Sequence, residues 1–176
     1  MRTVLSAVLI ALPAAAFAAG GDETPPKPTK TTKECAGKRV WDDKKGRCVR
    51  AQNSSLDEQG LYDAVRELAY AGRLLDAQAV LAAMPDQQDD RVLTYWGFTH
   101  RKLGGLDVGM QFYQRALAVN PDNILARSYM GQGLLEAGDL PGAKAQLAEI
   151  RARGGKNTWA ERSLAQAIQT GKSYNY

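Results

Sequence analysis

The sequence predicts an all-α protein, an array of helical hairpins that follows a small disulfide-closed N-terminal hairpin. Three observations lead to this fold class. From Leu56 onward, apolar residues recur at the helical period rather than at every second position. Short turns interrupt this pattern at Gly72, Gly104 and Gly138, which are separated by 32 and then 34 residues. The only two cysteines of the chain lie before the helical part.

The first residues have the pattern of a secretory signal peptide, which we place at 1–18. Arg2 precedes a mostly apolar run, and Ala16-Phe17-Ala18 carries small residues at the two positions that signal peptidase inspects. The run is shorter than the ~20 apolar residues of a membrane-spanning helix, and no later segment reaches that length. We therefore expect cleavage after Ala18, no integral membrane span, and a periplasmic or secreted protein.

Residues 19–34 are predicted to be a flexible linker. Pro25-Pro26-Lys27-Pro28 favours an extended polyproline conformation. The Thr-Lys repeats that follow offer no apolar side chain to bury, so this composition does not predict a packed structure.

The formal net charge of +4 is unevenly distributed. After cleavage, the part before Ser55 has nine Lys or Arg against five Asp or Glu, and the part from Leu56 has thirteen against fourteen. The helical array is therefore nearly neutral, and we expect no nucleic-acid partner. A solvated basic leader explains the excess, although such a segment can also touch anionic lipid or polymer.

Cys35 and Cys48 are predicted to form one intramolecular disulfide, because their number is even and the expected compartment is oxidising. Two β-rich halves with a polar, glycine-containing turn between them predict a small hairpin over residues 35–50. A redox pair usually has C-x-x-C spacing, and a zinc site would need more ligands than the remote His100. A structural bridge is expected, and a small binding knob that uses Trp41 is the alternative.

Side chains recur at matching positions in three helical hairpins within residues 56–171. Small residues such as Gly97 and Gly131 would let the first helix of a hairpin approach its own partner, and large ones such as Tyr113 would fill the space between hairpins. The matching positions are Leu61, Ala64, Val65, Leu68, Ala77 and Leu81 in the first copy; Leu93, Trp96, Gly97, His100, Gly109, Tyr113 and Pro121 in the second; and Arg127, Met130, Gly131, Leu134, Ala143 and Leu147 in the third.

With this period and these positions, the region resembles the tetratricopeptide repeat, although His100 and Gly109 depart from the usual aromatic residue and alanine. The whole chain, with Cys35, Val40-Trp41-Asp42 and Cys48 ahead of the repeats, is similar to periplasmic repeat proteins of α-proteobacteria. The resemblance implies about three stacked hairpins with a concave, peptide-binding surface. An unrelated antiparallel helical bundle is the alternative.

The last helix is predicted to cover the end of the array. Thr158 and Glu161 fit a capping box at its start, and Gly171 ends it. An apolar stripe on one side of this helix suits a terminal element that has one wet face. Residues 172–176 are predicted to be a tail.

Catalytic chemistry is not indicated by any motif, and we expect a protein that is not an enzyme. The single histidine, His100, occupies a helix-packing position. The acidic run from Asp86 to Asp90 lacks the spaced oxygen ligands and turn glycine of a calcium loop, and capping of the next helix explains it. The sequence points to no cofactor and no metal.

The candidate site is the surface that the first helix of each hairpin presents inside the array. Arginine forks match carboxylates, and aromatic faces supply apolar contact area, so we expect an extended, partly acidic segment of a partner protein there. An ordinary solvated face is the alternative. The candidate residues are Tyr62, Arg66 and Tyr70 in the first hairpin; Arg91, Thr94, Phe98, Arg101 and Lys102 in the second; and Ser128 and Gln132 in the third.

The expected function is that of a non-catalytic scaffold or adaptor of the cell envelope, with a protein or peptide partner. Two alternatives stay open: an accessory factor for envelope assembly, and a protein that binds cell-wall material through Trp41 and the disulfide hairpin. The sequence does not indicate an oligomeric state.

Overall fold

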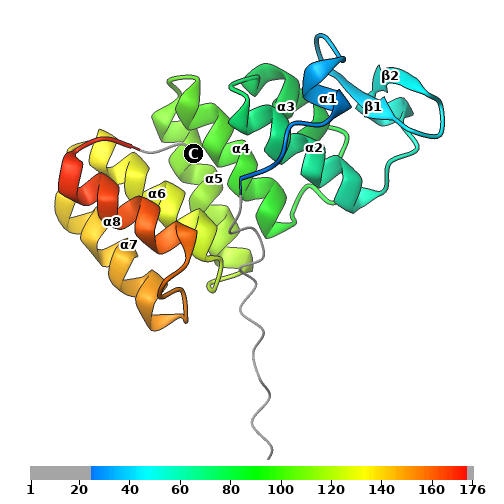
Figure 1. Ribbon diagram of the computed structural model, residues 1–176. Helices are drawn as coiled ribbons and strands as arrows, with labels where there is room; N and C mark the ends of the chain where they lie inside the picture. Colours follow the sequence, from blue (N-terminus) through cyan, green and yellow to red (C-terminus); the bar gives the residue numbers. More distant parts are fainter. Residues whose placement is uncertain (1–24, 174–176) are drawn as a thin grey trace, which may run out of the picture.

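A computed structural model describes residues 25–173 (Figure 1). The predicted signal peptide, the start of the predicted linker and the last three residues of the predicted tail lie outside this range. The described part is mostly helical, with eight α-helices and one two-stranded antiparallel sheet. None of these helices has the length and apolar character needed to cross a membrane.

The helices of the array follow one another in pairs along the molecule (Figure 1). Helix α2 packs on α3, α4 on α5, and α6 on α7, while α8 packs on both α6 and α7. The bounds are α2 Glu58–Tyr70, α3 Leu74–Leu81, α4 Asp90–Lys102, α5 Leu106–Val119, α6 Ile124–Glu136, α7 Leu140–Ala152 and α8 Trp159–Thr170. The sequence prediction of a mainly helical protein is confirmed.

The three turn glycines end the first helix of each pair in the same way. Gly72, Gly104 and Gly138 have φ values of +74°, +90° and +82°, a left-handed conformation that costs a residue without Cβ little. The amide after each glycine donates to a carbonyl five residues earlier, at 2.8 to 2.9 Å. This is the geometry of a Schellman motif, so the recurring glycines mark equivalent helix ends.

Close packing of α4 on α5 depends on Gly97. A Cβ atom at this position would lie 2.5 Å from the wholly buried ring of Tyr113 and 3.0 Å from the carbonyl oxygen of Gly109. Gly131 has a different neighbour from the one expected. Its added Cβ would meet Leu164 of α8 at 2.6 Å, so this glycine admits the last helix rather than its own partner helix.

Helix α8 covers the end of the array, where Leu164 and Ile150 are wholly buried. The Thr158 hydroxyl accepts a hydrogen bond from the Glu161 amide at 3.2 Å, as the predicted capping box requires. The Glu161 carboxylate accepts from the amide of Asn157 rather than from that of Thr158. Gly171 ends the helix in the left-handed conformation, also as predicted.

Residues 29–34 correct the linker prediction. Helix α1 (Lys30–Lys33) begins at Thr29, and Thr31 within it is buried. The reason is a long-range contact, because Glu67 of α2 supplies hydrogen-bond acceptors to the first turn of α1. Local composition therefore did not reveal the helix.

The predicted disulfide and hairpin are both present. Strand β1 (Arg39–Asp42) pairs antiparallel with β2 (Arg47–Arg50), and Cys35 is bonded to Cys48. Val40 is wholly buried in the same apolar cluster as Leu61 and Leu68 of α2. The hairpin is therefore part of the molecule's core rather than a separate appendage.

Candidate functional site

Three tyrosines form a ladder across the first helices of the three pairs. Tyr62 of α2, Tyr95 of α4 and Tyr129 of α6 are buried, and neighbouring rings meet edge to face with centroids 5.7 and 6.3 Å apart. Trp159 of α8 extends the row, 6.2 Å from Tyr129. Edge-to-face contacts of this kind stabilise aromatic pairs beyond the area that they bury.

Beside this ladder lies a group of residues that we call the tyrosine–arginine cluster: Arg66, Tyr70, Tyr95, Phe98 and Tyr129. The hydroxyls of Tyr70 and Tyr129 are hydrogen-bonded at 2.6 Å. The ring of Phe98 lies 4.9 Å from that of Tyr129 and 6.2 Å from that of Tyr70. The cluster therefore joins α2, α4 and α6 and combines apolar ring faces with hydroxyl groups and one guanidinium.

The Tyr95 hydroxyl is the unusual group of this cluster. The side chain is wholly buried, and among the described residues its oxygen has no hydrogen-bond partner. Burial raises the pKa of Tyr95, and the charge of Arg66 together with the nearby hydrogen-bonding groups of Tyr70, Arg66 and Tyr129 offsets part of that rise. These groups surround the hydroxyl, but none forms a well-aligned hydrogen bond with it, so its loss of water on burial is only partly offset.

The predicted site residues occupy the expected helices but are less accessible than a solvent-lined groove requires. Tyr70, Arg91 and Lys102 keep intermediate exposure, and Arg66 keeps 8%. The buried members are Tyr62, Arg66, Thr94, Phe98, Arg101, Ser128 and Gln132. Tyr62, Arg66, Tyr70 and Phe98 gather around Tyr95. Arg91 and Arg101 lie at the edge of this group, over the rings of Tyr62 and Phe98.

Arg101 connects helices within the chain, whereas the sequence predicts that it contacts a partner. Its Nη1 donates to Glu136 of α6 at 2.6 Å, and its Nε donates to the Tyr113 hydroxyl of α5 at 3.3 Å. Burial raises the pKa of Tyr113 to about 12, so this phenol stays neutral as an acceptor. Lys102, the next residue, has its pKa lowered by burial and by the charge of Arg101.

The remaining predicted site residues also bind within the chain. The Ser128 hydroxyl donates to the Ala160 carbonyl oxygen at 2.8 Å, and Gln132 Nε2 donates to Ser163 Oγ at 3.1 Å. Thr94 Oγ1 accepts from Asn123 Nδ2 at 3.1 Å. The Arg91 guanidinium pairs with Asp89 at 3.1 Å and lies 4.7 Å above the Tyr62 ring.

The sequence interpretation did not select Tyr95 and Tyr129. A signal for them was nevertheless present, because Tyr62, Tyr95 and Tyr129 are separated by 33 and 34 residues, the period of the turn glycines. Matching positions in successive repeats lie above one another in a stacked array, so residues at this spacing are expected to form a ladder.

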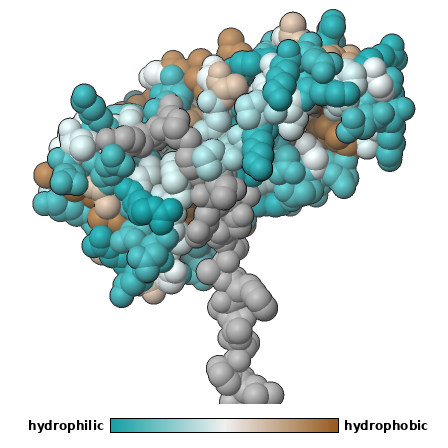
Figure 2. Space-filling model, viewed as in Figure 1, coloured by the Kyte–Doolittle hydropathy of each residue, from teal (hydrophilic) through white to brown (hydrophobic). Residues whose placement is uncertain are grey.

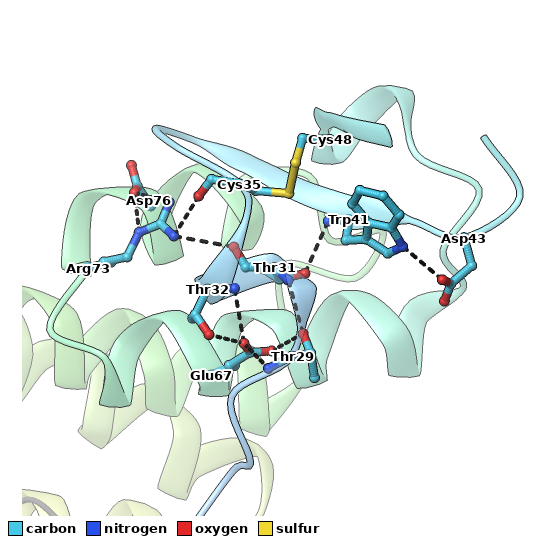
Figure 3. Close-up of a disulfide and its surroundings, with 10 residues drawn as sticks. All are labelled: Thr29, Thr31, Thr32, Cys35, Trp41, Asp43, Cys48, Glu67, Arg73 and Asp76. Carbon is cyan, nitrogen blue, oxygen red and sulfur yellow. Dashed lines mark hydrogen bonds and ion pairs between the residues drawn. A yellow bond between two sulfur atoms is a disulfide. The ribbon is translucent and has the colours of Figure 1, made fainter. Parts of the chain in front are cut away.

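A second set of polar contacts fixes α1 and the hairpin to the array (Figure 3). The Glu67 carboxylate accepts from the Thr29 amide and hydroxyl, each at 2.7 Å, and from the Thr32 amide at 3.1 Å. Arg73 Nη1 donates to the Cys35 carbonyl oxygen at 2.8 Å, while its Nη2 lies 2.7 Å from Asp76. Helix α2 and the turn that leads into α3 thus hold the N-terminal segment.

Trp41, the candidate residue of a binding knob, is half-buried and engaged on two sides. Its Nε1 donates to Asp43 at 2.8 Å, and Lys30 Nζ lies 4.3 Å from the ring centroid (Figure 3 shows the first contact). Its backbone amide donates to the Thr31 hydroxyl at 3.0 Å. These contacts orient the indole within the hairpin.

Among residues 25–173, no group of three or more potential metal ligands occurs, and neither cysteine is free. His100 is predicted to pack in the core, but its side chain keeps intermediate exposure. Its ring stacks against those of Trp96 and Phe112, with centroids 5.8 and 5.5 Å apart. Asp89 caps α4 by accepting from the Arg91 and Val92 amides, as predicted for the acidic run.

Comparison of this chain with protein-family models, with curated proteins and with solved structures gave no match. The fold and the two sets of contacts described above therefore define the class of protein: a mostly helical protein with a disulfide-closed N-terminal hairpin.

Proposed function

We propose that this protein is a non-catalytic binding protein of the tetratricopeptide type, which holds a segment of a partner protein against α2, α4 and α6. The observation that carries the proposal is the tyrosine–arginine cluster, which joins α2, α4 and α6 and places the buried Tyr95 hydroxyl beside Arg66, Tyr70 and Tyr129. The recurring turn glycines and the ladder at the same period support the repeat assignment. A location outside the cytoplasm is part of the proposal and agrees with the disulfide.

The chemistry of the cluster favours a partner segment that carries a carboxylate beside an apolar side chain. A guanidinium and a phenol hydroxyl are both donors to a carboxylate, and hydrogen bonds to a charged group are about twice as strong as neutral ones. The rings of Phe98 and Tyr70 offer apolar faces next to these donors. Tyr70 is the member with intermediate exposure, so a partner would meet the cluster beside it.

Tyr95→Phe separates binding from stability and is the first test. The substitution removes a buried hydroxyl that has no well-aligned hydrogen bond and keeps the ring, so the variant should be at least as stable as the wild type. Tyr95 is wholly buried, so its hydroxyl would act on a partner by positioning Arg66 and Tyr70. If it does, the same variant should bind that partner at least several-fold more weakly. Thermal unfolding and titration calorimetry measure the two quantities.

The partner for this test is obtained by cross-linking to the full chain in the envelope of its source, identified by mass spectrometry and then purified. Arg66→Gln should weaken its binding as Tyr95→Phe does. Arg115→Gln, a change of the same kind on α5, is the matched control and should bind as the wild type does. Unchanged affinity in both cluster variants would exclude the cluster as the binding site.

A further inference from the structure

Arg39 and Arg50 lie directly opposite each other in the two-stranded sheet. Residues in such positions point to the same face, and like charges placed directly opposite destabilise a sheet. Both side chains are exposed, and within the described residues neither has an ion pair or a hydrogen bond that would offset this repulsion. The pair therefore has an unexplained energetic cost.

The surroundings of the pair are basic as well. Between residues 29 and 53, which we call the N-terminal knob, there are eight Lys or Arg and three Asp or Glu. Figure 2 shows hydrophilic side chains over most of this end of the molecule. One of the three acids, Asp42, is buried and bound to Ser55, so it does not screen the arginines.

A cleft of about 930 Å³ lies between the knob and α3, and both arginines line it. Lys38 and Gln52 complete the polar wall, and small alanine side chains of α3 and the following turn form the opposite one. Asp76 also lines the cleft, but its carboxylate is bound by Arg73 and by the Lys38 amide. The lining thus has three cations against one acid that is already paired.

We propose that this cleft is an anion site, in which Arg39 and Arg50 together bind a phosphate group. A phosphate presents several free oxygens in tetrahedral directions, so two guanidinium forks can bind it at once. A carboxylate has only two oxygens, and a single guanidinium can engage both of them, which leaves little for a second arginine to bind. A bound dianion would also replace the repulsion between the two arginines by attraction to both, which explains their facing positions.

The site is independent of the tyrosine–arginine cluster, since it lies on the knob and on α3 and the turn after it rather than on α2, α4 and α6. The disulfide contributes to it indirectly. Cys48 is two residues before Arg50 on β2, and Cys35 is next to the cleft residue Ala36, so the bridge fixes the distance between the two sides of the knob.

The test is a titration of the oxidised full chain with inorganic phosphate, followed by the amide signals of Arg39, Arg50 and Gln52. Saturable shifts are expected, with an affinity that falls as ionic strength rises. The double variant Arg39→Gln/Arg50→Gln should bind at least tenfold more weakly. Its melting temperature should equal or exceed that of the wild type because the like-charge pair is gone, so weaker binding cannot reflect unfolding.

The matched control is Lys44→Gln/Arg47→Gln, which also removes two positive charges, but from the exposed turn end of the hairpin. It should bind phosphate within twofold of the wild type. Equal weakening in both double variants, or shifts that do not saturate, would overturn the site. Equally tight binding of acetate would overturn the assignment to phosphate.

Two sources could supply the phosphate group, and vesicles distinguish them. Sedimentation with phosphatidylglycerol vesicles, but not with phosphatidylcholine alone, that is lost in Arg39→Gln/Arg50→Gln and competed by phosphate would identify a lipid headgroup. Saturable binding of inorganic phosphate without such sedimentation would identify a soluble phosphorylated ligand. Each outcome supports the site itself.

Discussion

Asp42 is the residue that anchors the end of β1. Its buried carboxylate accepts from the Ser55 amide and hydroxyl, each at 2.7 Å, and from the Lys45 amide at 3.0 Å. Burial alone would raise the pKa of Asp42, but the hydrogen bonds from Ser55 and Lys45 and the Lys45 charge lower it below the ordinary value of an aspartate. The ionised form is thus the one that the folded chain holds.

This direction predicts how stability depends on pH. A folded-state pKa below the unfolded value gives stability that is complete above the unfolded pKa and is lost as pH falls through the folded pKa. The stabilisation by Asp42 should therefore be complete at pH 7 and decline below about pH 4. Melting temperatures of the wild type and of Asp42→Asn, measured from pH 7 to pH 2.5, should differ most at pH 7 and converge in acid.

Asp43→Asn is the control for this series, because Asp43 is the exposed neighbour of Asp42. It should parallel the wild type at every pH. A constant difference between Asp42→Asn and the wild type down to pH 2.5 would mean that the ionisation of Asp42 does not contribute to stability.

At the level of single helices, Gly97 and Gly133 both lie at helix contacts, but the side chains that face them differ in how easily they can move. A Cβ at Gly97 would lie 2.5 and 2.6 Å from two ring atoms of Tyr113, a wholly buried side chain that cannot retreat. At Gly133 the nearest atom is the Met110 sulfur, at 2.9 Å, which belongs to a flexible side chain. The two sites should respond differently to the same methyl group.

Gly97→Ala should therefore lower the free energy of unfolding by about 1–3 kcal/mol, because overpacking outweighs the better helix propensity of alanine. Gly133→Ala should lie within about 1 kcal/mol of the wild type, since Met110 can move and the propensity gain remains. Urea unfolding curves give both values. A Gly97→Ala variant as stable as Gly133→Ala would contradict the close crossing of α4 and α5.

Helices and their ends could be predicted because local sequence determines them. The turn glycines, the Thr158 cap and the disulfide depend on neighbours in sequence or on the expected compartment. Helix α1 could not be predicted, because its first turn is capped by Glu67, 38 residues away from Thr29. Its Thr-Lys composition is that of a linker, and only the tertiary contact makes it a helix.

The accessibility of the candidate site likewise depends on packing beyond one helix. Helical register assigned Tyr62, Arg66 and Phe98 to helices that meet, and all three lie beside Tyr95 in the structure. Register does not give the tilt between successive pairs, which decides whether such side chains face solvent or one another. Arg101 shows this plainly, since its guanidinium turns to Glu136 and Tyr113.

Across the whole molecule, the knob and the helical array behave as one packed unit in the structure. Val40 lies in the largest apolar cluster, which extends to Tyr129 of α6. Glu67, Arg73 and Asp76 add polar contacts from the first helix pair. Loss of order in the knob should thus expose apolar surface of α2 and α3 as well.

Removal of the disulfide should therefore lower the stability of the entire chain. The bridge closes a loop with a sequence separation of 13 residues, for which the chain-entropy model gives about 3 kcal/mol. Cys35→Ser/Cys48→Ser should unfold in a single transition, shifted down by several degrees and seen equally by far-UV circular dichroism and tryptophan fluorescence. An independent knob would instead give an unshifted main transition by circular dichroism. In that case, the contacts of Glu67 and Arg73 would contribute little to the docking of the knob.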